Sequence, residues 1–556
     1  MLQQEQSDAI IHRTAPEGVL ESTSMIHTLT DLIERQAAAN PDAIAINDRE
    51  RLTTYAEFAK ASRRLARGLS NAGIGHGDRV AFWLPNVAAY LMLHFACARL
   101  GVITVSVNTR FRSTEVGDII GRAGCKALIL WPSFKDIPFL DILTHVDAAA
   151  LAELETVILY DEGEDAVDLP SALAGKTMIR FGDLDRQPEL QESLAAEEDG
   201  TMIFTTSGTT AAPKFVLHSQ AGIVRHARNV AEYFEWNRDA AVVLQALPLC
   251  GTFGHTQAMA TLAAGCPMIS LPVFSGTDAA RLMLRHGITH VNGSDEMFAL
   301  ILDAVEGDQP FPEFRYGGYA AFNPAYADIP ERAAARGMPL VGLWGMSEMQ
   351  ALYARQDYTA ITGVRIRAGG QLTSPQAAVR VRDPDSGKLL PHGEAGEIET
   401  SGPSQMKEYF RDPAATAAAR TDDGYIRTGD LGYTEANGGF IFLARMGDAL
   451  RLGGFLVNPS EIEAHVQSHP SVDKAQVVGV ETSGGTKAYA FVVPAHGSVF
   501  DADIVQAWCA GNMAKFKVPA GLMALDAFPV TESANGVKIQ KARLREMALA
   551  ALSEET

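Results

Sequence analysis

The sequence predicts an α/β protein made of two domains. A large N-terminal domain of parallel α/β sheets plus a β section is followed by a small α+β C-terminal domain. Three observations support this prediction: strand and helix patterns alternate over the first part of the chain, strands become short with Gly-rich turns near residue 360, and a Gly-rich joint follows Arg445. We place the boundary between the domains 1–446 and 447–556.

The first elements alternate in the way that builds a parallel sheet. A helix is expected from the capping Thr28 to an Asn-Pro pair, and a strand over 43–47 follows it. An amphipathic helix over 54–73 ends in glycine. The strand, buried helix and strand within 78–108 imply a right-handed crossover. The pattern returns at four places: 125–131, 156–160, 260–273 and 288–293.

The β section and the small domain have a different character. Segments 377–402 and 424–445 combine short strands with Gly and charged turns, which is typical of antiparallel strands. After the joint, Pro459 is expected to begin a helix that carries Glu461 and Glu463 in its first turn.

Composition excludes several classes of protein. The 556 residues carry 47 Lys and Arg against 67 Asp and Glu, so the formal charge of −20 argues against a nucleic-acid partner. The polar N-terminus and the interrupted apolar runs predict neither a secretory signal nor a membrane span. Five widely spaced cysteines without a CxxC pair favour the cytoplasm over a disulfide or zinc framework: Cys97, Cys125, Cys250, Cys266 and Cys509.

Residues 202–215, MIFTTSGTTAAPKF, form the strongest local signal. A short apolar strand runs into six consecutive Thr, Ser and Gly residues, and Lys214 follows a proline. Small residues let backbone N–H groups approach oxyanions, and the lysine adds a positive charge. The composition therefore favours a phosphate cradle, although an ordinary hydroxyl-rich turn explains this segment alone equally well. It is not the GxxxxGK[ST] P-loop, because no Ser or Thr follows the lysine.

This segment resembles the phosphate loop of the adenylate-forming superfamily, which includes AMP-dependent acyl-CoA synthetases and ligases, luciferases and peptide-synthetase adenylation domains. The chain is identified as a member because further blocks resemble the family's motifs in the same order over about residues 28–545. These blocks are RVAFWLPN with GVITVSVNTRF, LWGMSE, YIRTGDLG, ARMGDALRLGGFLVNPSEIE and NGVKIQK.

The resemblance implies an acyl-CoA synthetase with a mobile C-terminal domain. ATP transfers AMP to a carboxylic acid, and the thiol of coenzyme A then attacks the acyl adenylate, releasing AMP. The first step concentrates charge on the phosphates, so the site needs fixed cations and donors, with Mg²⁺ among them. ATP, Mg²⁺, coenzyme A and a small carboxylic acid are therefore the expected cofactors and partners.

The resemblance also assigns roles residue by residue. It implies Lys538 as the catalytic lysine at the α-phosphate, Glu348 with Thr206 as Mg²⁺ ligands, and Asp430 as the acceptor of the ribose hydroxyls. Arg445 would contact ribose or phosphate, and Trp344 would stack on adenine or simply pack in the core. The remaining roles are the phosphate cradle (Thr206, Ser207, Gly208, Thr209, Thr210, Lys214), the adenine wall (Gly317, Gly318, Tyr319), the pantetheine path (Gly453, Gly454) and contacts near the nucleotide of coenzyme A (Lys515, Lys517).

The chain departs from the family pattern at several positions. Ala211 stands where Gly is usual and Phe215 where Gly usually follows the lysine. Gly447 occupies the hinge position, usually Asp or Lys, and we expect it to be the pivot of the small domain. In NGVKIQK one residue separates the glycine from Lys538, which we prefer to Lys541 as the catalytic lysine.

The segment that the resemblance places along the substrate tunnel differs most from the family pattern. Family members often have an aromatic–histidine pair where this chain has Cys250 and Gly251, so a wider or differently gated acyl tunnel is expected. The segment also lacks the aspartate by which amino-acid-activating members bind an amino group. His255, His286 and His290 show no metal-ligand spacing, and structural roles are expected for them and for Cys250.

Two alternatives stay open beside the acyl-CoA synthetase. One is adenylation followed by transfer to the thiol of a carrier protein, and the other is a nucleotide-binding protein without turnover. Luciferase-like oxygenation finds no specific support. The sequence does not name the acid, although the small tunnel residues favour a bulky or branched acyl group, and it leaves a homo-oligomer open.

Overall fold

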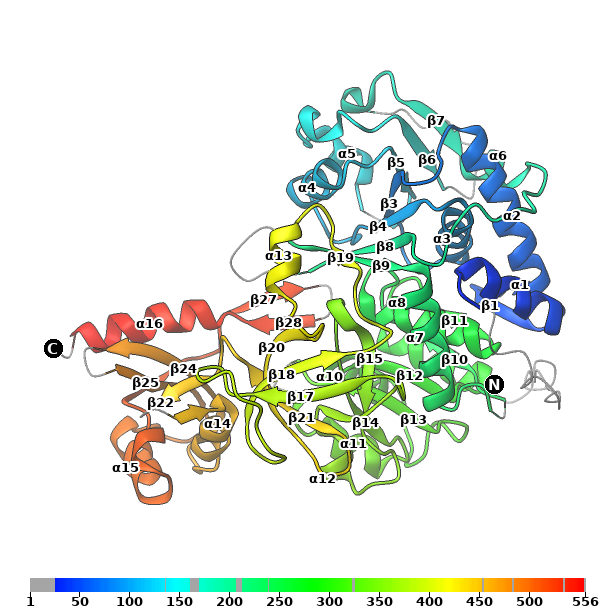
Figure 1. The fold of residues 1–556 in the computed structure, drawn as a ribbon. Coiled ribbons are helices and arrows are strands. Elements are labelled where there is room, and N and C mark those ends of the chain that lie inside the picture. Colours follow the sequence, from blue (N-terminus) through cyan, green and yellow to red (C-terminus); the bar gives the residue numbers. More distant parts are fainter. Residues whose placement is uncertain are drawn as a thin grey trace.

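The computed structural model describes residues 26–135, 137–160, 170–206, 213–238, 240–322, 326–452, 455–482, 485–533 and 536–554. Within them the chain forms a large part built on two sheets of many strands and a small C-terminal part whose sheets have only two or three strands (Figure 1). This confirms the predicted fold class.

The first sheet is mostly parallel. Its strands from β4 outward to β7 pair in parallel, and β8 pairs in parallel with β4, whereas β9 and β19 join antiparallel at the other edge. In spatial order the strands are β19 (Glu408–Tyr409), β9 (Phe215–Ser219), β8 (Gly200–Thr205), β4 (Ile103–Ser106), β3 (Arg79–Trp83), β5 (Ala127–Leu130), β6 (Thr156–Leu159) and β7 (Thr177–Arg180).

The second sheet joins a parallel half to the antiparallel β section. Strands from β1 to β14 pair in parallel, and from β14 onward every pair is antiparallel. The β section therefore continues the parallel sheet. Its order is β17 (Ala378–Arg382), β18 (Gly396–Ser401), β20 (Ile426–Thr434), β21 (Phe440–Arg445), β16 (Gly369–Leu372), β15 (Gln350–Arg355), β14 (Leu340–Met346), β13 (Tyr316–Ala320), β12 (His290–Ser294), β10 (Val243–Gln245), β11 (Met268–Ser270), β1 (Ile44–Asp48) and β2 (Arg51–Thr54).

Helices cover these sheets, and two of them are largely buried. In α3 nearly all residues are buried and in α8 most are, including polar ones, whereas α2 is amphipathic and begins with a Thr54–Glu57 capping box. The helices of the large part are α1 (Leu29–Ala39), α2 (Tyr55–Asn71), α3 (Ala88–Leu100), α4 (Ser113–Ala123), α5 (Phe139–Thr144), α6 (Phe181–Asp185), α7 (Gln220–Tyr233), α8 (Thr252–Ala264), α9 (Gly276–His286), α10 (Asp295–Asp303), α11 (Ile329–Ala335), α12 (Thr362–Arg365) and α13 (Pro413–Ala418).

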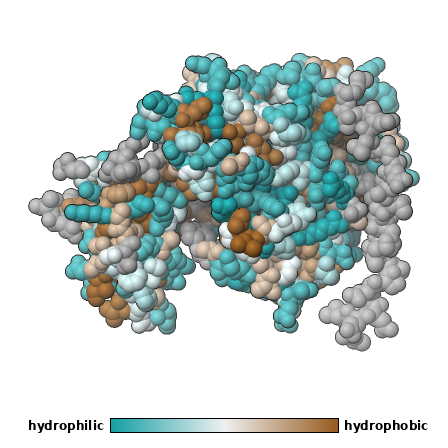
Figure 2. All heavy atoms as spheres, turned by 60° about the horizontal axis from the view of Figure 1, so that its bottom comes forward, coloured by the Kyte–Doolittle hydropathy of each residue, from teal (hydrophilic) through white to brown (hydrophobic). Residues whose placement is uncertain are grey.

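The small part has its own cores. Aliphatic side chains of α14, α15 and the β24–β25 sheet pack into one cluster, and α16 packs on the other face of that sheet. Figure 2 shows a largely hydrophilic face with separate apolar patches, one of them on this part. Its elements are β22 (Leu450–Leu452), β23 (Phe455–Val457), α14 (Pro459–Gln467), β24 (Val472–Thr482), β25 (Gly485–Pro494), α15 (Ala502–Asn512), β26 (Gly521–Ala524), β27 (Val530–Ser533), β28 (Gly536–Ile539) and α16 (Lys541–Glu554).

A short linker connects the two parts. Strand β21 ends at Arg445, and the backbone N–H groups of Asp448 and Ala449 both donate to the Arg445 carbonyl. The Arg545 guanidinium of α16 donates to the Gly447 carbonyl and pairs with Asp448, both over 3.0 Å. The last helix is thus fastened to the linker. The domain boundary at 446/447 and the mobility of the small domain stay predictions.

In the part of the chain that the structure describes, none of the helices combines the length and the apolar character that a membrane span requires.

Candidate active site

Several candidate residues lie at or directly after the ends of strands in the two sheets. Parallel strands place their carboxyl ends at one edge, and ligands of open α/β sheets bind there. Thr206 follows β8, and Glu348 lies in a 3₁₀ turn (Ser347–Met349) directly after β14. Asp430 and Arg445 face each other across the β20–β21 pair. Motifs far apart in the sequence thereby share one region.

The predicted phosphate segment is closed at its base. The Thr206 N–H donates to the Lys214 carbonyl over 3.0 Å, and the Lys214 N–H donates to the Thr206 hydroxyl over 3.2 Å. Lys214 itself is exposed, as a phosphate-binding cation must be. Four predicted cradle residues lie outside the described residues, as does Ala211: Ser207, Gly208, Thr209 and Thr210.

Arg122 fastens the second end of this segment. Both of its terminal nitrogens donate to the Pro213 carbonyl over 3.0 Å, and its guanidinium lies 4.4 Å from the centre of the Phe215 ring. Its own carbonyl accepts a hydrogen bond from Arg411. Phe215, unusual for the resembled family, thus packs against a cation that also holds the preceding backbone.

Glu348 is held through both its backbone and its side chain. The Tyr409 hydroxyl donates to Glu348 Oε1 over 2.7 Å, and the Met406 N–H donates to the Glu348 carbonyl over 2.7 Å. The ammonium of Lys214 lies 4.6 Å from the centre of the Tyr409 ring. Tyr409 therefore contacts the carboxylate and the lysine of two separate motifs.

These groups suit Mg²⁺. Glu348 is partly exposed, and among the described residues its Oε2 atom accepts no hydrogen bond. A carboxylate and the Thr206 hydroxyl are hard oxygen donors, and Mg²⁺ commonly takes one or two such protein ligands together with phosphate oxygens and water. We find the donor set chemically compatible with the predicted metal role.

Trp344 and Arg445 each contact one oxygen of the Asp430 carboxylate. The Trp344 indole N–H donates to Oδ2 over 3.0 Å, and Arg445 Nη1 lies 2.8 Å from Oδ1. The Trp344 ring is buried edge-on against Tyr353 and Phe440. These contacts are those of a packed core residue, and stacking of Trp344 on adenine stays a prediction.

Burial dominates the charge state of Asp430. Desolvation raises the pKa of its carboxyl group to about 6, against the opposing effects of Arg445 and the Trp344 hydrogen bond. The negative charges of Glu348 and Glu397 raise this pKa further. The candidate carboxylates Asp430 and Glu348 thus lie close enough for the charge of Glu348 to affect the pKa of Asp430.

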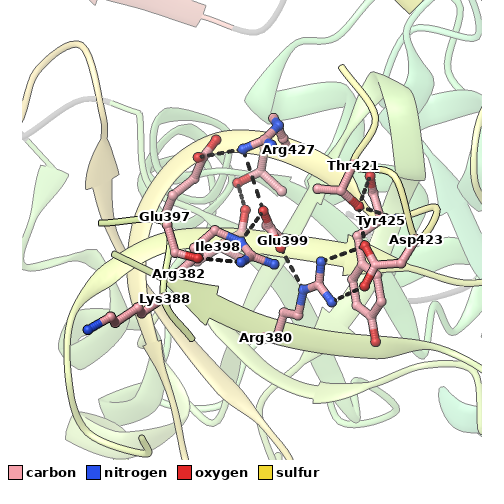
Figure 3. Close-up of polar contacts among 12 residues, drawn as sticks. Arg380, Arg382, Lys388, Glu397, Ile398, Glu399, Thr421, Asp423, Tyr425 and Arg427 are labelled. Atoms are coloured by element: carbon pink, nitrogen blue, oxygen red, sulfur yellow. Dashed lines mark hydrogen bonds and ion pairs between the residues drawn. The ribbon is translucent and has the colours of Figure 1, made fainter. Parts of the chain in front are cut away.

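A buried carboxylate secures the strands that carry Asp430. Glu399 in β18 is completely buried and accepts hydrogen bonds from Arg380 Nε (2.6 Å) and Arg382 Nε (2.9 Å), as Figure 3 shows. Arg380 also pairs with Asp423 through both terminal nitrogens and lies 3.8 Å from the centre of the Tyr425 ring. This network joins β17, β18 and the start of β20.

The predicted adenine wall is largely inside the sheet. Gly317 and Gly318 lie in the interior of β13, between β12 and β14. A Cβ atom on Gly318 would come within 2.0 Å of the Asn292 side-chain oxygen, so a larger residue there would have to displace the Asn292 side chain. Tyr319 is buried, and desolvation raises the pKa of its phenol.

The predicted tunnel residues lie at the N-terminus of α8, next to the Glu348 motif. Gly251 is the N-cap of α8 in an extended conformation, and the following Thr252 hydroxyl donates to the Ser347 hydroxyl over 3.2 Å. Burial raises the pKa of the Cys250 thiol to about 12, which keeps it protonated and argues against a nucleophile.

The histidines have structural surroundings. His255 of α8 lies 3.2 Å from His94 of α3, nitrogen to nitrogen, and burial lowers the pKa of His94 to about 3. His290 packs against Tyr316, and His286 faces Glu50. Among the described residues no group of three or more His, Cys, Asp or Glu side chains could hold a metal ion.

The candidates of the small part lie on one hairpin and one turn. The backbone of Lys538 belongs to β28, opposite Thr531 of β27, and Lys541 begins α16. In Figure 1 this hairpin projects from α16 toward the large part. Lys515 is exposed and Lys517 pairs with Glu461 over 2.8 Å, whereas Gly453 and Gly454 lie outside the described residues.

Sequence reasoning missed Tyr409 and Arg122. Tyr409 sits in a strand of two residues and meets Glu348 61 residues earlier in the chain. Arg122 meets Pro213 91 residues away. Neither contact produces a periodic pattern in the sequence around it. The only local feature that could have pointed to Tyr409 is the charged and aromatic character of residues 406–410, MKEYF.

The two-sheet fold with a smaller C-terminal part is the architecture expected of a nucleotide-binding α/β enzyme, and the candidate carboxylates Glu348 and Asp430 lie in one region of it. Its family follows from comparison with known proteins. The chain belongs to the AMP-binding enzymes: the family model of the AMP-binding enzyme matches residues 33–410, and that of the AMP-binding enzyme C-terminal domain matches residues 461–535.

Individual relatives cover nearly the whole chain. A putative acyl-CoA synthetase, YngI of Bacillus subtilis (strain 168), is 28% identical over 94% of this chain and 98% of its own length. A feruloyl-CoA synthase of Amycolatopsis sp is 29% identical over 92% of this chain and 97% of its own. The ATP-bound crystal structure of MatB from Rhodopseudomonas palustris superposes with a TM-score of 0.78 at 27% identity, covering 93% and 98% of the two chains. The chain is accordingly an AMP-forming acid–thiol ligase.

Proposed function

We propose that the protein is an acyl-CoA synthetase that uses ATP and Mg²⁺ to adenylate a carboxylic acid and then forms a thioester with coenzyme A. The products are acyl-CoA, AMP and pyrophosphate. The relatives' names support the acid–thiol class, and the choice of coenzyme A over a carrier-protein thiol is part of this proposal.

One observation carries the proposal most directly. Asp430 is a buried carboxylate with a raised pKa, and Glu348, whose charge contributes to that shift, is partly exposed at the end of β14. In the proposed reaction Asp430 accepts the ribose hydroxyls while Glu348 holds Mg²⁺ on the phosphates. A nucleotide presents both a ribose and phosphates, and the proposal assigns the buried carboxylate to the first and the partly exposed carboxylate to the second.

Lys214 and Lys538 would supply the positive charge. Lys214 is exposed at the base of the cradle segment, where it neutralises the β- and γ-phosphates. Lys538, in the β27–β28 hairpin, would reach the α-phosphate and the attacking carboxylate when the small domain is in its adenylating arrangement. The hinge at Gly447 would then exchange this arrangement for one that admits coenzyme A.

Pyrophosphate release with ATP, Mg²⁺ and a panel of carboxylic acids tests the adenylation half. The panel should include short aliphatic, medium-chain, aryl and polycyclic acids, because the relatives do not agree on one acid and the Cys250–Gly251 pair favours bulk. We expect release with at least one acid, and none with the Lys538→Ala variant. Absence of release across the panel, from protein that binds ATP, would contradict the proposal.

The acceptor is tested separately. Supplying coenzyme A or a phosphopantetheinylated carrier protein after adenylation, and measuring thioester by mass spectrometry, distinguishes the two thiols. We expect product with coenzyme A. Product with the carrier protein alone would replace this half of the proposal by the alternative. We also place the protein in the cytoplasm, consistent with five cysteines that form no disulfide in the described part of the chain, and cell fractionation with a specific antibody checks this.

A further inference from the structure

We propose that Tyr409 is a positioning residue that orients Glu348 for Mg²⁺ and at the same time seats Lys214 for phosphate. This inference rests on the proposed function, since it takes Glu348 as a metal ligand and Lys214 as a phosphate ligand. It adds a residue outside both motifs that makes them act together.

The contact with Glu348 is short and charge-assisted. The Tyr409 hydroxyl donates to Oε1 over 2.7 Å, a length typical of a bond between O–H and an ionised carboxylate. A carboxylate has two oxygens that rotate together, so fixing Oε1 also fixes the direction of Oε2. The atom left without a bond among the described residues is then held ready for the cation, in the way that outer-shell partners orient metal ligands.

Tyr409 is itself rigidly placed. The residue is 5% exposed, and its backbone pairs with Val216 of β9 in the antiparallel β9–β19 ladder. Its N–H donates to the Thr416 hydroxyl over 2.9 Å. Because β9 begins immediately after Lys214, the strand that leaves the phosphate segment also sets the position of the phenol.

The aromatic ring of Tyr409 positions Lys214. The Lys214 ammonium lies 4.6 Å from the ring centre, a cation–π contact that limits where the flexible lysine side chain can go. One side chain thus contacts a proposed metal ligand by its oxygen and a proposed phosphate ligand by its face.

Two variants separate these tasks. Tyr409→Phe removes the hydroxyl and keeps the ring, whereas Tyr409→Leu removes both. For Tyr409→Phe we expect roughly a tenfold or greater rise in the dissociation constant of Mn²⁺ from the full-length enzyme with ATP, measured by electron paramagnetic resonance of free Mn²⁺. The Mg²⁺ concentration that gives half-maximal pyrophosphate release should rise in parallel, while the KM for ATP at saturating Mg²⁺ stays near that of the wild type.

Tyr409→Leu should show the same metal defect and also raise the KM for ATP at saturating Mg²⁺ by roughly two- to fivefold, the size of an exposed cation–π contact. Tyr55→Phe is the matched control. Tyr55 is also buried and donates to the Cys266 carbonyl over 3.2 Å, but it lies in α2, so its variant should leave the metal dependence unchanged.

The Glu348→Gln variant distinguishes a failure of the inference about Tyr409 from a failure of the proposed metal role of Glu348. If Glu348→Gln weakens Mn²⁺ binding and Tyr409→Phe leaves it within twofold of the wild type, the inference about Tyr409 is wrong and the proposed metal role stands. If Glu348→Gln changes neither Mn²⁺ affinity nor pyrophosphate release, the metal role itself is wrong. A metal defect in Tyr55→Phe equal to that in Tyr409→Phe would also overturn the inference, since it would trace the effect to a lost buried hydroxyl in general.

Discussion

The indole N–H of Trp344 donates to Asp430 across the second sheet, from β14 to β20, over 3.0 Å. The bond stabilises the ionised form of a carboxylate that burial otherwise pushes toward its protonated form. Trp344 therefore bears on the charge of Asp430.

Nucleoside binding should depend on pH through Asp430. Above its pKa of about 6 the group is an acceptor for ribose hydroxyls, and below it the group is protonated, so affinity should fall as the pH drops through about 6. In Trp344→Phe the lost donor raises this pKa, which moves the midpoint upward by as much as one pH unit for a bond of about 1.4 kcal/mol. Adenosine binding by calorimetry between pH 5 and 8 measures it, because adenosine carries no phosphate that titrates there.

An Asp430→Asn variant serves as the control and should bind adenosine weakly with a flat profile over this range. Identical midpoints in the wild type and in Trp344→Phe would show that the indole does not tune Asp430.

Removing the charge of Glu399 should destabilise the large part of the chain. Glu399→Gln leaves Arg380 and Arg382 without their buried counter-charge, and we expect a loss of about 3 kcal/mol in the free energy of unfolding. Urea unfolding measures it. The control is Glu546→Gln, which breaks the exposed pair with Arg543 and should cost less than about 0.5 kcal/mol. Equal losses in both variants would mean that the network in Figure 3 is not a stabilising one.

Lys538→Ala should lower the rate of pyrophosphate release by roughly a hundredfold or more, because a fixed cation at a developing charge contributes on that scale. Thioester formation from a supplied acyl adenylate should be spared, since the small domain is then in its other arrangement. Quenched-flow assays of the two half-reactions measure both rates. Near-normal adenylation by Lys538→Ala, with a loss in Lys541→Ala, would move the catalytic role to Lys541.

Gly251→Phe should narrow the acyl tunnel and shift preference toward smaller acids. The residue is extended at φ −98°, so a side chain is compatible with the backbone, and the ring must find room near Thr252 and Ser347. Added bulk in a packed wall typically costs about 1–3 kcal/mol, which lowers kcat/KM for large acids by one to two orders of magnitude. An unchanged profile of kcat/KM against acid size would show that position 251 does not face the substrate.

Gly447→Pro should trap one arrangement of the small domain. Proline fixes φ near −65°, so a linker that must rotate loses one of its two states, and we expect thioester formation to suffer more than adenylation. A Cβ atom at this position meets open space, so Gly447→Ala is a suitable control and should keep both half-reactions. Equal loss of both halves in a folded Gly447→Pro variant would contradict the pivot at this residue.

Much of the fold can be predicted from the sequence, because individual helices and strands depend on local residue patterns. The capping Thr28, the apolar strand β3 and the continuous apolar character of α3 each identify an element from neighbouring residues. The pattern change near residue 360 likewise marked the antiparallel section, although it could not show that β14 and β15 join the section to the parallel sheet.

The site is less legible because its contacts are long-range. The motif around Glu348 identified a candidate ligand, yet the partner that fixes it lies in β19, a strand too short to produce any periodicity. The sequence allows adenine stacking or core packing for Trp344, and neither alternative includes its hydrogen bond to Asp430. Such pairings depend on sheet order, which no single segment encodes.

The fastening of α16 to the linker has an evolutionary consequence. Arg545 holds the Gly447 carbonyl and the Asp448 carboxylate together, so the C-terminal helix and the linker form one mechanical unit. A change of charge at position 448 leaves Arg545 without its charged partner, and the reverse also holds. Among descendants of this chain positions 448 and 545 should therefore change together, whereas position 447 contributes only a backbone carbonyl and should accept side chains other than proline.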